Sequence, residues 1–248
     1  MDKKFPYKGL FIFYLVALFF RFIAVKTTLY SSIDNEYLLI LLSGIGPAIG
    51  AFIAIKVTQI PLNLSLKGNY RNLFLPLMVF WGFPVILIGA VSYVQQGSFP
   101  FLLLVTVLLY GLLEEIGWRG FLQEQFKNLP KLQSVVLITV LWFVWHLNFE
   151  LTASNLIFFA VLFFGTWGIG KVYSSTYSLL AVAGFHSLNN FFRNGLHGTE
   201  LILIAVLLAC WIGFMLWYKQ KYRQEQEVWE INMNLQKAGS EKMTSGHI

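Results

Sequence analysis

The sequence predicts an all-α protein that crosses a membrane several times, and three observations support this fold class. Hydrophobic residues make up 57% of the 248 residues and charged residues only 12%, which is about half the charged share of a soluble domain. The apolar residues form continuous runs rather than alternating patterns, which favours helices over a β-barrel. Aromatic residues reach 17%, as expected for helices with interfacial aromatic belts. We therefore expect a polytopic membrane helix bundle of about eight transmembrane helices.

Eight apolar runs define these helices in chain order. They cover residues 9–25, 37–57, 73–94, 100–126, 132–149, 154–171, 177–195 and 199–218. Residues typical of helix ends separate them, namely Ser31, Pro61, Gly97, Pro130 and Ser174. Within the second run, the glycine-rich stretch Gly44–Gly50 predicts close helix packing or a proline kink. Residues 219–248 form a polar tail of mixed charge.

The basic residues predict how the helices are oriented. With the N-terminus inside, 15 of the 18 lysines and arginines fall in inside segments, and cytoplasmic loops carry such an excess. We therefore expect a multi-pass protein of the plasma membrane with both termini cytoplasmic. Because these residues are spread over short loops without a basic stripe, we expect no nucleic-acid partner. Arg21 lies inside the first run, and we expect it to snorkel or to meet a lipid headgroup.

Polar residues inside three of the runs are candidates for function, because an ionisable group within a span costs several kcal/mol. They are Glu114, Glu115 and Arg119 in the fourth run, His146 in the fifth, and His186 and Asn190 in the seventh. Glu115 and Arg119 are four residues apart and can pair, whereas Glu114 points about 100° away from Glu115. Side chains from three helices can converge in the core of a bundle. The lone Cys210 excludes an intramolecular disulfide and a cysteine metal site.

The surroundings of these residues are predicted less directly. A fourth helix that continues to about Phe126 has its midpoint near Glu114, and we expect a kink or water-filled opening to the cytoplasm there. That opening would solvate Arg119 and Glu124. A second group, Trp118, Trp142 and Trp145, could line a substrate groove, although we favour core or interfacial packing for these tryptophans.

These motifs, in this order, resemble one protein family. Glu-Glu-x-x-x-Arg at 114–119, a histidine late in the next run and His-x-x-x-Asn at 186–190 are similar to the motifs of the CPBP family. This family comprises the CAAX proteases and bacteriocin-processing enzymes, is also called the Abi family, and includes the type II CAAX prenyl endopeptidases. The resemblance covers roughly residues 100–195, and Trp142 stands where the second motif often has phenylalanine.

The resemblance also implies a domain organisation. N-terminal transmembrane helices would occupy 1–98, a CPBP/Abi-like catalytic core of four helices 99–196, a last transmembrane helix 197–218, and the cytoplasmic tail 219–248.

The activity implied is that of an intramembrane endopeptidase acting at the lipid bilayer on a hydrophobic or lipidated peptide or protein. CAAX-type substrates, bacteriocin or pheromone precursors, and a role in bacteriocin self-immunity are all open. Glu114 would be the general base with His146, while His186 and Asn190 would contact the water or the oxyanion. Glu115 and Arg119 would support this geometry.

The cofactor and two alternative functions stay open. A metal-free glutamate mechanism and a metalloprotease mechanism are both compatible with the residues, and zinc would take Glu114, His146 and His186 as ligands. A non-catalytic immunity or scaffold protein of the same fold is the main alternative to an enzyme. A proton-coupled transporter is another, because buried glutamate and histidine also form proton relays.

Overall fold

The computed structural model describes residues 7–60, 64–69 and 73–191, and parts of 202–220. The chain divides into two units, Met1–Gly195 and Leu196–Ile248, each of which is considered by itself. The elements of the first unit are α1 (Tyr7–Lys26), α2 (Glu36–Thr58), α3 (Phe74–Leu77), η2 (Met78–Gly82), α4 (Phe83–Gln96), α5 (Phe101–Glu115), η3 (Ile116–Gln123), α6 (Lys131–Trp145), α7 (Ala153–Thr176) and α8 (Leu179–Phe191). Here η denotes a wide helical turn of π type. The described part of the second unit is helical, while Pro61 and nearly all of the tail lie outside the described residues.

Five helical stretches are long and apolar enough to cross a membrane. They are α1, α2, Phe74–Gln96, Phe101–Gln123 and α7. Together with the absence of strands from the described residues, this confirms the polytopic helical fold. The expected eight full-length spans are not all present there, because α6 has only 15 residues, fewer than the roughly 20 that a span needs. The chain leaves α6 early because Leu147 adopts a left-handed conformation, with φ of 56°.

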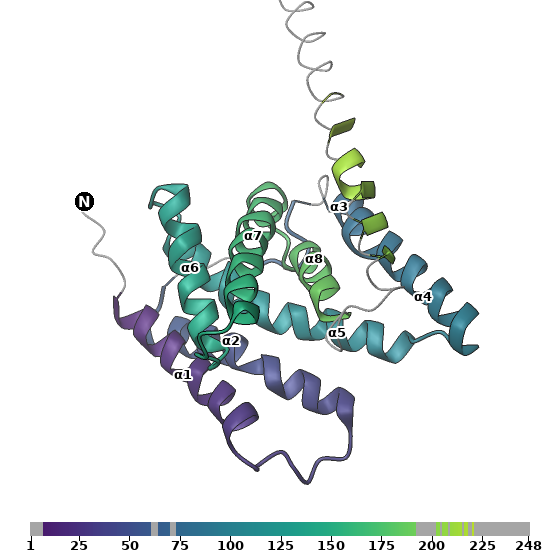
Figure 1. Cartoon of the computed structure of the whole chain (residues 1–248). Coiled ribbons are helices and arrows are strands. Elements are labelled where there is room, and N and C mark those ends of the chain that lie inside the picture. The colour runs from purple at the N-terminus through teal and green to yellow at the C-terminus, as the bar shows by residue number, and fades with distance from the viewer. Residues whose placement is uncertain are drawn as a thin grey trace, which may run out of the picture. The chain divides into compact units, whose positions relative to one another are not determined.

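The continuous helix formed by α5 and η3 is the most enclosed of these five stretches. Half of the residues in its most apolar 18-residue segment are buried, against 17% in the corresponding segment of α1. It packs against α2 and α8 (Figure 1). Both contacts are close: a Cβ atom added to Gly111 would lie 2.9 Å from the Ala183 carbonyl oxygen, and one on Gly117 would lie 2.7 Å from that of Pro47. The candidate residues on this helix therefore lie in the middle of the bundle.

The glycine-rich stretch of α2 receives α1. A Cβ atom on Gly46 would lie 2.8 Å from the Ala17 carbonyl oxygen, and one on Gly50 would lie 2.5 Å from that of Phe13. Real Cβ atoms do not approach backbone oxygens so closely, so only glycine allows this separation of the two helices. The prediction of close helix packing in this stretch is confirmed.

Two hydrogen bonds attach α6 to α1. The Tyr14 hydroxyl donates to the Leu141 carbonyl at 2.8 Å, and the Trp145 indole N–H donates to the Ala17 carbonyl at 3.0 Å. The paired positions rise together along both helices, so α1 and α6 run in the same direction at this contact. The end of α6 is thereby held beside the turn of α1 that contains Arg21.

The start of α8 is fixed by the segment that follows α2. The Ser178 hydroxyl donates to the Leu66 carbonyl at 2.7 Å, and the backbone N–H of Leu179 donates to the Ser65 carbonyl at 3.1 Å. Gly68 has a φ of 56°, and a Cβ atom there would lie 2.2 Å from the Thr176 carbonyl oxygen, so this position requires glycine. These contacts hold α8 at the height at which His186 reaches α5.

Candidate active site

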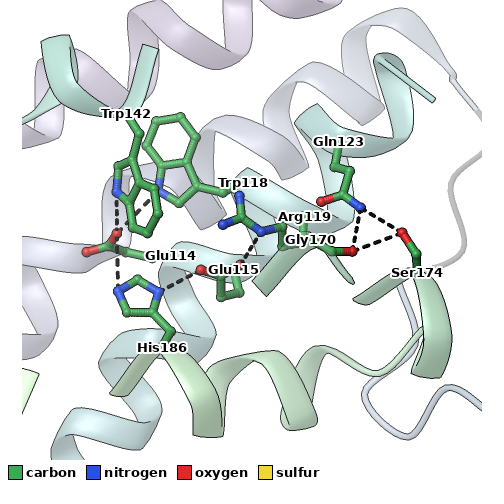
Figure 2. Close-up of polar contacts among 9 residues, drawn as sticks. All are labelled: Glu114, Glu115, Trp118, Arg119, Gln123, Trp142, Gly170, Ser174 and His186. Carbon is green, nitrogen blue, oxygen red and sulfur yellow. Dashed lines mark hydrogen bonds and ion pairs between the residues drawn. The ribbon is translucent and has the colours of Figure 1, made fainter. Parts of the chain in front are cut away.

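The two adjacent glutamates lie where the helix changes from α5 to η3. Glu114 and Glu115 are both buried, and the following turns are widened; such π-type turns occur frequently at functional sites. At the far end of η3, the Gln123 side-chain amide donates to the Gly170 carbonyl and the Ser174 hydroxyl, both at 3.3 Å (Figure 2). The widened segment is therefore held against α7.

Glu115 is the centre of a buried charged group. Its Oε2 lies 3.2 Å from Arg119 Nε, and its Oε1 accepts from His186 Nδ1 at 2.6 Å (Figure 2). The Arg119 N–H is not aligned for a hydrogen bond to Glu115, so this contact is an ion pair. The Arg119 guanidinium also lies 5.4 Å from the centre of the Trp142 ring.

The expectation that water solvates Arg119 is wrong. Its side chain has no exposed surface. The Glu115 carboxylate and the Trp142 ring compensate its charge inside the protein, so no opening to water is needed there. Further along, Glu124 pairs with the exposed Lys127 at 3.2 Å.

Glu114 has different partners from its neighbour. Its Oε2 accepts from the indole N–H groups of Trp118 at 3.2 Å and Trp142 at 3.0 Å. His186 Nε2 lies 3.9 Å from the same oxygen, so His186 stands between the two glutamates (Figure 2). The expected burial of both tryptophans is confirmed, but their hydrogen bonds to Glu114 were not anticipated. The spacing of four between Glu114 and Trp118 was a signal for one of them.

One cavity of about 250 Å³ collects four of the predicted site residues. Glu114, His146, His186 and Asn190 all line it, whereas Glu115 and Arg119 do not. The Asn190 side-chain nitrogen is buried and has no hydrogen-bond partner among the described residues. The remaining lining residues are Arg21, Tyr110, Trp142, Phe158, Val161, Leu162 and Gly165. The cavity thus has a polar side and an apolar wall from α7.

His146 follows the last residue of α6 and is held by a backbone contact. Its Nδ1 lies 2.7 Å from the Trp142 carbonyl oxygen. A carbonyl only accepts, so Nδ1 carries the proton, and in the neutral ring Nε2 is then an acceptor. The Phe158 ring packs edge-on against the imidazole at a centroid distance of 4.8 Å. These contacts fix the orientation of His146 at the cavity.

Arg21 also lines this cavity. Its guanidinium lies 4.5 Å from the centre of the Trp145 ring. Because Trp145 also binds the Ala17 carbonyl, one helical turn before Arg21, the contact between α1 and α6 turns this side chain inward.

The side chains do not form a ready metal site. Among the residues that the structure describes, no three histidine, cysteine or acidic side chains are grouped so that they could hold an ion. In particular, the set Glu114, His146 and His186 is not so grouped, although all three line the cavity.

The fold and site define a class of protein, an integral membrane protein with a carboxylate–histidine centre enclosed by its helices. Residues 95–192 match the family described as type II CAAX prenyl endopeptidase, Rce1-like. This match confirms the resemblance drawn from the three motifs and covers α5 through α8. No curated protein matches the chain. The family relation supports protease activity at the general level, with a peptide substrate reached from the bilayer. It leaves α1 and Arg21 outside the matched segment.

Proposed function

We propose that the protein is an intramembrane endopeptidase that hydrolyses a peptide bond in a hydrophobic or lipidated peptide or protein. One observation carries the proposal: Glu114, His146, His186 and Asn190, from three separate helical segments, line a single cavity inside a membrane protein. A base, an orienting histidine and an unpartnered amide donor are the groups that hydrolysis by an activated water requires.

Glu114 is the proposed general base. A water between Glu114 and His146 Nε2 would be oriented by both groups and would lose a proton to the Glu114 carboxylate as its oxygen attacks the substrate carbonyl carbon. The indole N–H groups of Trp118 and Trp142 hold one carboxylate oxygen. They thereby set the direction of Glu114 before a substrate arrives.

The carbonyl oxygen becomes negatively charged when the water adds. The unpartnered amide nitrogen of Asn190 is one proposed donor to this oxyanion, and His186 Nε2 is the other when the ring is protonated on both nitrogens, since Nδ1 donates to Glu115. Such an interaction is typically worth a few kcal/mol. When the C–N bond breaks, the proton held by Glu114 passes to the leaving amine, which balances the reaction. Glu115 and Arg119 do not contact substrate in this scheme, since they act by holding His186.

The natural substrate is proposed only as a class. The apolar wall of Phe158, Val161 and Leu162 suits a hydrophobic segment. CAAX-type proteins and bacteriocin or pheromone precursors all present such segments, and a role in self-immunity would use the same chemistry.

The test compares the same replacement, glutamate by glutamine, at Glu114 and at a control position. We expect Glu114→Gln, in protein reconstituted into liposomes with a fluorogenic hydrophobic peptide, to lower kcat by about 10²- to 10⁴-fold, the usual contribution of a general base. His146→Ala should lower it similarly. Glu150→Gln, on an exposed loop residue, is the matched control and should cleave normally. Full cleavage by Glu114→Gln would refute the assignment. A physiological effect that survives this substitution would favour the scaffold alternative.

Metal removal tests the mechanism separately. Because the described side chains form no group able to hold an ion, we expect cleavage to survive prolonged dialysis against a chelator. Elemental analysis should find far less than one zinc per chain. One zinc per chain, lost together with activity and restored on adding zinc back, would instead assign Glu114, His146 and His186 as ligands.

A further inference from the structure

Arg21 brings a positive charge to the cavity from a helix outside the family match. It lines the same space as Glu114, His146 and Asn190. Among the residues that the structure describes, it forms no ion pair with a carboxylate, whereas the buried Arg119 pairs with Glu115. A cation within an apolar bundle is costly unless an anion compensates it, so this charge calls for a partner.

The contacts that Arg21 does make leave most of its donors free. Its Nη1 lies 3.5 Å from the Ser43 carbonyl oxygen, the outer limit of a hydrogen bond. Its Nε is buried without a partner in the described part of the chain. The central carbon of the guanidinium lies over the Trp145 ring, 4.5 Å from its centre. This contact occupies the ring and not the N–H groups of Arg21.

We infer that Arg21 binds a carboxylate of the peptide substrate. The inference rests on the proposed function, since it concerns the substrate of the same cavity. A guanidinium presents its N–H groups in a planar fork that matches the two oxygens of a carboxylate, and the cation–π contact with Trp145 restricts where that fork lies. The cavity then offers a cation beside Glu114 and an apolar wall from α7. It fits a peptide whose hydrophobic residues lie close to a carboxylate.

The carboxylate can be the C-terminus of the peptide or an acidic side chain near the cleaved bond. Two pairs of otherwise identical peptides separate these sources. The first pair ends in a free acid or an amide, and the second carries aspartate or asparagine near the cleavage site. We expect wild-type protein to prefer the charged member of one pair, in kcat/KM, by about 10- to 100-fold, as expected for a charge-assisted hydrogen bond.

Variants of Arg21 test whether this residue recognises the peptide carboxylate. Arg21→Gln should lose the preference while cleaving the uncharged peptide as well as wild type does. Arg21→Lys should keep part of the preference, because it retains the charge but not the fork. A loss of equal size on both members of each pair would assign Arg21 a structural role only and overturn the inference. An absence of any preference in the wild-type protein would also overturn the inference.

A lipid anion is the competing partner, and vesicle composition tests it. Rates measured in phosphatidylcholine vesicles with and without phosphatidylglycerol should leave the peptide preference unchanged. An Arg21→Gln effect that depends on phosphatidylglycerol and not on the peptide charge would assign the site to lipid. Failure of the inference is distinguishable from failure of the proposed function, because cleavage that is lost in Glu114→Gln upholds the latter whatever Arg21 does.

Discussion

Two neighbouring glutamates acquire different tasks from their partners alone. Glu115 is neutralised by Arg119 and occupied by His186, so both of its oxygens face charged or hydrogen-bonding groups. Glu114 accepts hydrogen bonds from two neutral indoles, has His186 Nε2 at 3.9 Å and reaches the cavity. A carboxylate that is positioned without being neutralised is suited to accept a proton, whereas one held in an ion pair is suited to support structure.

The indole of Trp142 is predicted to matter for rate more than for folding. Trp142→Phe keeps an aromatic ring beside Arg119 and removes the N–H that donates to Glu114 at 3.0 Å. We expect kcat to fall about tenfold, because a hydrogen bond to a charged group is worth about 1.5–3 kcal/mol. Steady-state cleavage together with thermal unfolding in detergent measures the two effects. Trp167→Phe, at a half-exposed tryptophan outside the cavity, should change neither.

The sequence alone identified the polar residues of the site. It did not reveal the direction of Arg21 or the hydrogen bonds from Trp118 and Trp142. Glu114, His146, His186 and Asn190 could be found because ionisable and amide groups stand out within apolar runs. Arg21 was visible for the same reason, yet its direction depends on how α1 packs against Trp145, which no local pattern encodes. The donors on Trp118 and Trp142 were hidden because tryptophan is ordinary in membrane helices, where burial alone accounts for it.

At the scale of the elements, α7 shapes the space in which the chemistry would occur. It supplies the apolar wall and includes Gly165, where an added Cβ atom would meet nothing within 4 Å. The glycines of α2 are the opposite case, because backbone oxygens of α1 pack directly against them. Glycine thus permits helix contact in one helix and keeps the cavity open in another.

Filling the cavity from α7 is predicted to block cleavage without unfolding the protein. Gly165→Leu places a branched side chain in the space of about 250 Å³ that the substrate would enter. We expect kcat/KM to fall at least tenfold, because small displacements of a substrate already cost large factors in rate. Gly165→Ala should retain most activity.

Two comparisons exclude a general effect of replacing helical glycine. Gly213→Leu, at another position with nothing within 4 Å but no place in the cavity, should cleave normally. Gly50→Ala should lower the unfolding temperature, since its Cβ would meet the Phe13 carbonyl. Normal cleavage by Gly165→Leu would show that the substrate does not enter beside α7.

Helix positions followed from the sequence more closely than helix lengths did. The runs 9–25, 37–57 and 100–126 correspond to α1, α2 and the continuous α5–η3 helix, because each is bounded by residues that end helices. The run at 132–149 was expected to be longer than α6. Its apolar composition continues past Trp145, where the helix ends, and composition does not reveal the left-handed conformation of Leu147.

At the scale of the whole molecule, the direction of each helix is linked to the side on which the site opens. α1 and α6 run in the same direction where they meet, as the three crossings between them, α2, Phe74–Gln96 and Phe101–Gln123, require. The excess of basic residues then predicts that both helices begin at the cytoplasmic side. The His146 end of α6 would lie toward the opposite side, together with Arg21.

Cysteine labelling tests this orientation in a chain that is convenient for it, since Cys210 is the sole cysteine. In a Cys210→Ser background, Asp34→Cys should react with a membrane-impermeant maleimide in intact cells. Lys67→Cys should react only after permeabilisation. Both positions are exposed in the structure, so access depends on the side of the membrane, and the cysteine-free parent supplies the blank. The reverse labelling pattern would place both termini outside, and with them the basic loops, contrary to the charge distribution.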